Sequence, residues 1–378
     1  MGAMTDRFLQ SYGEVRDALA ALPPDVALRE IVESYADGIH RMFAQLPQYY
    51  LFLVLKLLPG PERDRNRFYK LGDDISRIIL PHLEADAAES AGNRTTATVA
   101  GRRKDSMQLM LMYTHVQLVV WSAFAFWTPL CRLRNHQQEL SESQRMARVA
   151  HTVGLCLHGL FPRAVHDIDY RAVERVAAVR RDELLEPNRI FAAVEAVVTE
   201  VGFEMASLDR IAKRLGMTKS SLYFYFENKD TMFSRALQTE RRHFNDLFAS
   251  RCDRLGSFSQ RLYGYIVTLA SYFLSNRSLM VFSNWVQVQR VPVTAGTADE
   301  DEILQSAEFI RQRLEKHSDP VRRDETLETL ALLSILMNRG LTTTGLSLER
   351  PRELFAYTRD FYRTVTHGIA PAGKDVYP

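Results

Sequence analysis

The stretch that decides the fold is NRIFAAVEAVVTEVGFEMASLDRIAKRLGMTKSSLYFYFENKDTMFSR, residues 188–235. Its first part carries apolar residues at helical spacing, which predict an amphipathic helix over 189–201: Ile190, Val194, Val197, Val198 and Val201. Gly202 ends this helix. Ser207 then offers the side-chain oxygen of an N-cap, so we expect a second helix to begin beside it.

The second helix is short, and a third follows it closely. Its inward-facing residues are Leu208, Ile211, Ala212 and Leu215, and its outward-facing residues are Asp209, Arg210, Lys213 and Arg214. Gly216 suits the left-handed position just past the helix, and Thr218 caps the third helix. Two short helices joined by a tight turn with glycine form a helix-turn-helix, whose second helix normally enters the DNA major groove.

The order of residues in this motif resembles one family. Thr218 to Phe226, followed by Asn228-Lys229-Asp230 and Phe233, is similar to the recognition helix and following helix of tetracycline-repressor-like (TetR-like) regulators. The upstream positions that also match are Gly202-Phe203, Ser207-Leu208, Ile211-Ala212 and Gly216. Tyr225 departs from the pattern, because the family usually has His there. A tyrosine hydroxyl can still donate to a phosphate.

The third helix leaves its polar side chains free to meet DNA. Leu222 and Phe226, one turn apart, face the small core of the motif. Most protein–DNA hydrogen bonds go to phosphate and sugar, and Lys, Ser, Thr and Tyr are common donors for them. A face rich in Lys and Arg is also typical of a solvated surface, but two nearby tyrosines on a short exposed helix favour a partner. The predicted DNA-binding residues are Ser207, Arg210, Thr218, Lys219, Ser220, Ser221, Tyr223, Tyr225 and Lys229.

Composition bounds the class of protein. With 378 residues the chain is long enough for two or three domains, and 46% hydrophobic with 25% charged residues is typical of a soluble globular protein. A net charge of +2 means that any basic surface is local. The three cysteines are scattered, which argues against a disulfide framework and predicts a reducing, cytoplasmic location, at the bacterial nucleoid when DNA is bound. We find no Ser/His/Asp set, metal-ligand spacing or phosphate loop, so we expect neither enzymatic activity nor a cofactor.

The rest of the chain predicts an all-α protein, because helical periodicity recurs and no strand pattern stands out. Helices are expected near 8–19, 31–46, 62–83, 141–160, 233–248, 258–275, 278–290, 302–316, 320–340 and 351–368, with a mobile loop over 85–101. Residues 106–131 contain no formal charge and are long enough to cross a bilayer. Polar residues such as His115 and Gln117 lie well inside this segment, so a helix buried within a helical domain is the favoured interpretation.

The second half of the chain repeats the first weakly. The uncharged helix begins with residues 102–107, and its counterpart begins with the similar residues 322–327 and runs through 329–346. The last helices of the two halves also end alike, in His158-Gly159-Leu160 and His367-Gly368-Ile369. The predicted domains are a helical ligand and dimerisation domain without its own helix-turn-helix (1–165), a linker helix (166–186), the helix-turn-helix domain (187–235), a second ligand and dimerisation domain (236–370) and a tail (371–378).

The resemblance implies a mechanism. TetR-like proteins are usually repressors that bind a palindromic operator in double-stranded DNA as dimers, and a small molecule in the helical domain releases the DNA. Candidate walls of an apolar effector pocket are Trp121, Phe124 and Trp127 in the first repeat and Phe282, Trp285 and Asn338 in the second, although plain core packing explains each equally well. We expect the two repeats to pair within one chain through their last two helices, 106–133 and 141–160 in the first and 324–341 and 351–369 in the second. A domain-swapped or ordinary homodimer is the alternative. The alternative function is a ligand- or protein-binding module with a vestigial DNA-binding domain.

Overall fold

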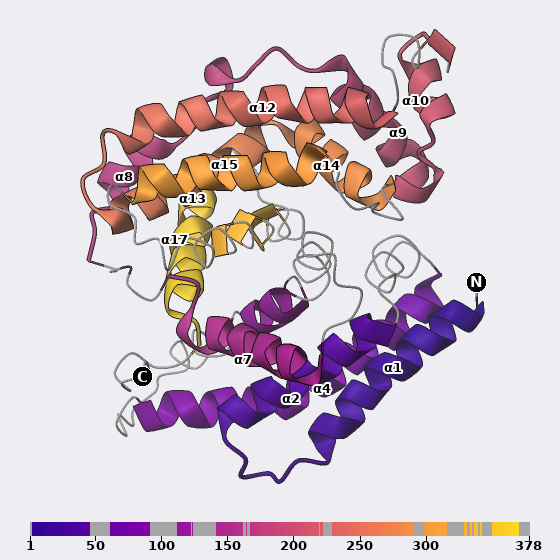
Figure 1. The fold of residues 1–378 in the computed structure, drawn as a ribbon, viewed down its shortest axis with the longest axis vertical. Coiled ribbons are helices and arrows are strands. Elements are labelled where there is room, and N and C mark those ends of the chain that lie inside the picture. The colour runs from indigo at the N-terminus through magenta and orange to yellow at the C-terminus, as the bar shows by residue number, and fades with distance from the viewer. Residues whose placement is uncertain are drawn as a thin grey trace. The chain divides into compact units, whose positions relative to one another are not determined.

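The chain is helical throughout the part that the structure describes. The structure is a computed structural model that describes residues 2–45, 61–90, 112–121, 123, 141–161, 164, 167–218, 220–221, 229–289, 298–315, 329–330, 333–334, 336–338, 341 and 350–369. No strand occurs among these residues, which confirms the predicted all-α fold. The chain forms two compact units, one of residues 1–163 with 363–378 and one of residues 164–362. Figure 1 shows the helices of both.

The first unit is built from long helices around an aromatic core. Its helices are α1 (Gly2–Ala20), α2 (Leu28–Gln45), α4 (Glu62–Ser90), the helical residues 112–121, and α7 (Glu142–His158). Helix α1 packs on α2 and α4, and α2 packs on α7. The predicted stripe on α2 is buried, with Ile31, Tyr35 and Ile39 at 1% exposure or less. Because these residues recur every third or fourth position, they form one face that the neighbouring helices cover.

The end of α4 differs from the sequence prediction, and the structure shows how α7 begins. Helix α4 continues to Ser90, so residues 85–90 are helical, although the sequence predicts a loop from 85 onward. Alanine has the highest helix propensity, and three of these six residues are Ala, which offsets the lack of large apolar side chains. At the start of α7, the Ser141 hydroxyl accepts a hydrogen bond from the Gln144 amide, and the Gln144 side-chain oxygen accepts one from the Ser141 amide.

The second unit contains the helix-turn-helix and the helices that follow it. Its elements are α8 (Tyr170–Ala177), the short 3-10 helix η3 (Arg181–Glu183), α9 (Arg189–Met205), α10 (Leu208–Arg214), α12 (Lys229–Cys252), α13 (Phe258–Ser275), α14 (Arg277–Gln289), α15 (Ala298–Leu314) and α17 (Pro351–His367). The predicted helices over 258–275, 278–290 and 351–368 agree with α13, α14 and α17 to within a residue. Helix α15 begins earlier than the predicted residue 302. The last turn of α17, from residue 363, belongs to the first unit.

The connector before the helix-turn-helix is only partly helical. The sequence predicts a linker helix over 166–186, but α8 ends at Ala177 and residues Ala178 and Arg180 are extended. Tertiary hydrogen bonds account for the break. The Thr268 hydroxyl donates to the Ala177 carbonyl, and the Val179 amide donates to the Ser271 hydroxyl at 2.9 Å. These bonds to α13 satisfy backbone groups that a longer helix would have paired internally.

The uncharged segment is described over 112–121 and at Ala123. Tyr113, Val116, Val119 and Val120 are buried there, as a helix inside a helical unit requires. The Trp121 indole donates to the Tyr35 hydroxyl at 2.7 Å, so its polar atom has a partner in the core. Within the described ranges, no helix combines the length and the hydropathy needed to cross a bilayer.

Candidate nucleic-acid interface

The first helix of the motif is anchored at both ends. The Asn188 side chain accepts a hydrogen bond from the Ile190 amide at 2.9 Å, which makes Asn188 the N-cap of α9. Gly202 has φ of 78° and ψ of 165°, a left-handed backbone that interrupts the helix where the sequence predicts its end. Three residues on the inward stripe are at 4% exposure or less: Phe191, Val194 and Val197. The predicted first helix is therefore confirmed.

The second helix and the turn also follow the sequence. Ser207 is the N-cap of α10, and its hydroxyl accepts from the Arg210 amide at 3.4 Å. Gly216 has φ of 72°, as the position after α10 requires, and the Met217 amide closes the turn on the Ala212 carbonyl at 2.9 Å. The Thr218 hydroxyl accepts from the Ser221 amide at 3.0 Å, so Thr218 caps the next helix. The glycine turn thus lies between α10 and the helical residues 220–221.

The outward face of α10 is basic. Arg210, Lys213 and Arg214 are exposed along its length, whereas Ile211 and Ala212 are buried. Asp209 is the acidic residue of this helix, so its seven residues carry a net positive charge. A cationic face next to the start of the third helix suits the phosphate backbone of DNA.

The predicted DNA-binding residues divide into two groups. The first group is described by the structure: its exposed members are Ser207, Arg210, Thr218 and Ser220, and Ser221 is half-buried. Lys219, Tyr223 and Tyr225 lie outside the described residues. Lys229 is the first residue of α12, but its side chain also lies outside the description. The DNA-binding role of all nine stays a prediction.

Helix α14 packs against α9 and against the residue before α10. The Trp285 indole donates to the Ala206 carbonyl at 2.9 Å, directly before the N-cap of α10. Both Phe282 and Trp285 are fully buried, and the Phe282 ring packs on Phe191 of α9 at 4.4 Å between centroids. Arg277 pairs with Glu195 at 3.5 Å on the same interface. The orientation of the motif is therefore fixed by the helix that follows α13.

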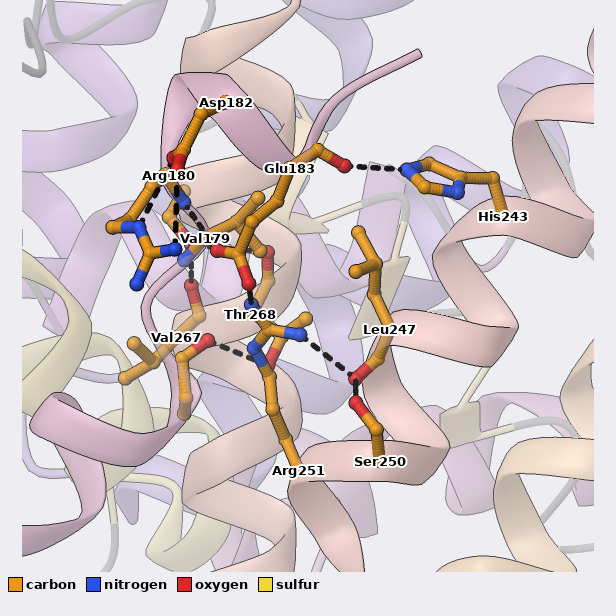
Figure 2. A network of polar contacts seen from close by, with 12 residues as sticks. Val179, Arg180, Asp182, Glu183, His243, Leu247, Ser250, Arg251, Val267 and Thr268 are labelled. Atoms are coloured by element: carbon orange, nitrogen blue, oxygen red, sulfur yellow. Dashed lines mark hydrogen bonds and ion pairs between the residues drawn. The ribbon is translucent and has the colours of Figure 1, made fainter.

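The connector is held to the same helices (Figure 2). His243 of α12 donates to the Glu183 carbonyl at 2.7 Å, and Arg251 of α12 donates to the Glu183 carboxylate at 2.8 Å. Arg251 also donates to the Leu247 carbonyl at 3.0 Å. Its side chain is 7% exposed, so this ion pair is shielded from water on the arginine side. Residue spacing does not indicate these contacts, because the partners are far apart in the chain.

A second, deeper ion pair holds α8. Glu174 is 4% exposed and accepts two hydrogen bonds from the Arg359 guanidinium of α17, both at 2.7 Å. The Tyr263 hydroxyl of α13 donates to the same carboxylate at 2.7 Å. The hydrogen bonds to Glu174 raise the pKa of Arg359. A carboxylate with three charge-assisted or hydroxyl donors is well satisfied, so α8 is fixed to α13 and α17.

The candidate effector residues lie in both units, as expected of one set in each repeat. Trp121 lies in the first unit, where its ring meets Tyr12 and Phe43 edge to face, both at 5.5 Å. Phe282 and Trp285 support the motif, and Asn338 is half-buried in the second unit. Phe124 and Trp127 lie outside the described residues. Among the described residues, no group of three or more His, Cys, Asp or Glu side chains is placed to hold a metal ion.

Comparison with known proteins agrees with the geometry of the motif. Residues 190–236 match the family model of the bacterial regulatory proteins of the tetR family. The match supports a TetR-family regulator. It covers α9, α10, the turn and the start of α12, the part that such a regulator uses to bind DNA, and so supports a DNA-binding transcriptional regulator. No match was found among curated proteins.

Proposed function

We propose that this TetR-like chain binds operator DNA through residues 188–235 and represses transcription until a small molecule releases it. The observation that carries the proposal is the capped α10, which exposes Arg210, Lys213 and Arg214 beside the Thr218 cap of the next helix. Capped, short helices present their side chains in a fixed register, which direct contact with a DNA groove requires.

The effector site is proposed to lie in the aromatic core of the first unit. Tyr12, Tyr35 and Trp121 meet there, and Trp121 donates to Tyr35. Gln117 donates to the Tyr113 hydroxyl, which in turn donates to the Gly72 carbonyl at 3.0 Å. Aromatic walls with a few fixed hydroxyl and amide groups suit a small, largely apolar molecule that carries one hydrogen-bonding group. Burial raises the pKa of all three tyrosines, so these hydroxyls stay neutral donors.

Release of DNA is proposed to act through α14. A ligand shifts an equilibrium only by its preference for one conformation over the other. Since α14 contacts α9 through Phe282 and the residue before the α10 N-cap through Trp285, a ligand-dependent change in α14 would alter the position of the motif. The effector therefore has to favour a conformation in which the Trp285 contact differs.

We also propose the tandem arrangement, with ligand and dimerisation domains over 1–165 and 236–370. Similar packing in the two units supports it. In the first unit α1 packs on α2 and α4, and in the second α12 packs on α13 and α15. The Tyr35 hydroxyl of α2 accepts from the Trp121 indole, and the Tyr265 hydroxyl of α13 shares a hydrogen bond with Ser334 at 2.8 Å, so a tyrosine hydroxyl of each second helix has a polar partner later in its unit. The two last helices would form the intrachain pairing.

The test measures, by fluorescence anisotropy, the binding of DNA from the region that flanks the protein's own gene. We expect binding that is stronger than to unrelated DNA by about a thousandfold, and that falls as salt rises. Equal weak binding to every DNA would contradict the operator proposal and would favour a binding module with a vestigial motif. Addition of candidate aromatic effectors should then weaken operator binding without changing the weak binding to unrelated DNA.

A further inference from the structure

The ends of α7 and α17 carry the same tripeptide pattern and bind each other. Helix α7 ends at His158 and is followed by Gly159-Leu160, and α17 ends at His367 and is followed by Gly368-Ile369. Both glycines have a left-handed backbone, with φ of 79° and 65°. Each glycine amide closes the last turn of its own helix, on Leu155 and on Thr364. The two segments, residues 155–160 and 364–369, are called the joint below.

Hydrogen bonds across the joint are reciprocal. The Leu160 amide donates to the Val365 carbonyl at 2.6 Å, and the Ile369 amide donates to the Cys156 carbonyl at 3.0 Å. Counted from the shared His-Gly pair, Leu160 corresponds to Ile369 and Cys156 corresponds to Val365. The donor of each segment therefore meets the acceptor of the other at the equivalent position. This is the pattern of a local two-fold axis.

The glycines make this approach possible. A Cβ on Gly159 would lie 2.4 Å from the backbone of Thr366 and 2.6 Å from the Gly368 amide. A Cβ on Gly368 would lie 2.5 Å from the Cys156 carbonyl and from the Gly159 amide. Backbone atoms cannot move aside as a flexible side chain can, so no other residue fits at either position. The close contact is again the same from both sides.

The joint is also well buried. Cys156, Leu160, Val365 and Ile369 are at 5% exposure or less, and Thr366 is fully buried. Apolar residues that flank two buried backbone hydrogen bonds exclude water from them, which makes an unpaired amide or carbonyl there costly. The two segments are thus complementary in shape, in hydrogen bonding and in hydropathy.

We propose that the joint is a two-fold interface of the kind that identical subunits make, formed here by two like segments of one chain. In such an interface residue i contacts j and j contacts i, which normally requires a second copy of the chain. Here both like segments, 155–160 and 364–369, belong to the same chain. Because both segments belong to one chain, their effective concentration is far above that of free protein in solution, and the joint closes without a partner. The inference does not depend on DNA binding.

Amide hydrogen exchange of the full chain tests the joint directly. We expect the Leu160 and Ile369 amides to be protected, and Gly368→Val to speed exchange at both by about tenfold or more. Residue 368 and Leu160 are far apart in the chain, so the substitution can reach the Leu160 amide only through the joint. Gly154→Ala is the matched control, because it lies on α7 with open space around its Cβ and should leave both amides protected. Unchanged exchange at Leu160 in Gly368→Val would overturn the proposal, and Gly368→Ala replaces the valine variant if that chain fails to fold.

Co-expression of two differently tagged copies decides whether the joint lies within one chain. We expect each tag to purify without the other while the wild-type amides remain protected. If both tags co-purify in the wild type and Gly368→Val or Gly368→Ala abolishes this, the joint forms between chains and the proposal is overturned. Co-purification that these variants leave unchanged would reflect a separate dimer surface and would support an intrachain joint. If DNA binding is lost while the joint persists, only the proposed function fails.

Discussion

The Trp285 indole donates a hydrogen bond to the Ala206 carbonyl at 2.9 Å, and both residues are fully buried. Ala206 directly precedes Ser207, the N-cap of α10. One side chain of α14 therefore fixes the residue at which the second helix of the motif begins. A change in α14 cannot move Trp285 without leaving a buried carbonyl unpaired or moving α10 with it.

Replacing Trp285 with Phe should destabilise the second unit and weaken DNA binding together. The phenyl ring keeps most of the packing but leaves the Ala206 carbonyl without its donor, a cost of about 1–3 kcal/mol. We expect a lower unfolding midpoint and operator affinity reduced about tenfold. Trp121→Phe is the matched control, because it removes the 2.7 Å bond to Tyr35 in the first unit. If both variants lower affinity equally, Trp285 has no special link to the motif.

The basic face of α10 should contribute to DNA binding without selecting sequence. Arg210→Gln and Lys213→Gln should each weaken binding to all sequences alike and reduce the salt slope by about 0.9, as loss of one phosphate contact does. The same is expected for Lys219→Ala and Lys229→Ala. Arg254→Gln serves as the control, since Arg254 is exposed just beyond the far end of α12. Salt titrations that match wild type for every motif variant would exclude this face from the DNA interface.

Glu174 should be important for the docking of α8. Glu174→Gln keeps the shape of the side chain but leaves the Arg359 guanidinium without its carboxylate, and breaking such a pair costs about 3 kcal/mol. Denaturant unfolding of the full chain measures the change. Arg180→Gln is the control, because its partner Asp182 and the arginine are both at the surface, so its removal should change little. If Glu174→Gln is as stable as the control, the favourable energy of the Glu174–Arg359 ion pair only offsets the cost of removing both charges from water.

The first unit should lose stability in mild acid because of His115. Burial lowers the pKa of this imidazole from 6.5 to about 4, against a smaller opposing effect from its hydrogen bond to the Leu155 carbonyl. The unfolded chain therefore binds a proton that the folded chain rejects, so the stabilisation is full above about pH 6.5 and falls as pH drops toward 4. At about 1.4 kcal/mol for each pH unit, the maximum loss is about 3 kcal/mol.

The control for this pH dependence is His115→Gln, which cannot titrate. Its unfolding free energy should change less between pH 7 and pH 5 than that of the wild type, as denaturant titrations at the two pH values would measure. His158 and His367 also have lowered pKa values through burial and stay in both proteins, so their effect cancels in the comparison. Equal pH dependence in the two proteins would mean that His115 is not the responsible group.

The sequence by itself determined the local structure of the motif. Asn188, Ser207 and Thr218 act as caps, and Gly202 and Gly216 adopt the left-handed backbone expected of them. These features depend on residues within four positions of each other, so the chain specifies them before any distant contact forms. The helical periodicity of α13, α14 and α17 is equally local, which is why their bounds were predictable to within a residue.

Only the tertiary structure decided which of these elements meet. The connector leaves the helix after Ala177 because Thr268 and Ser271, about ninety residues later, bind its backbone. Trp285 has the pattern of a pocket wall in sequence, yet it packs against Ala206. The shared His-Gly ending of α7 and α17 is visible in the sequence, but not the reciprocal bonds between Leu160, Val365, Cys156 and Ile369. Contacts of this kind depend on how buried surfaces fit in three dimensions, and residue spacing along the chain carries no information about that fit.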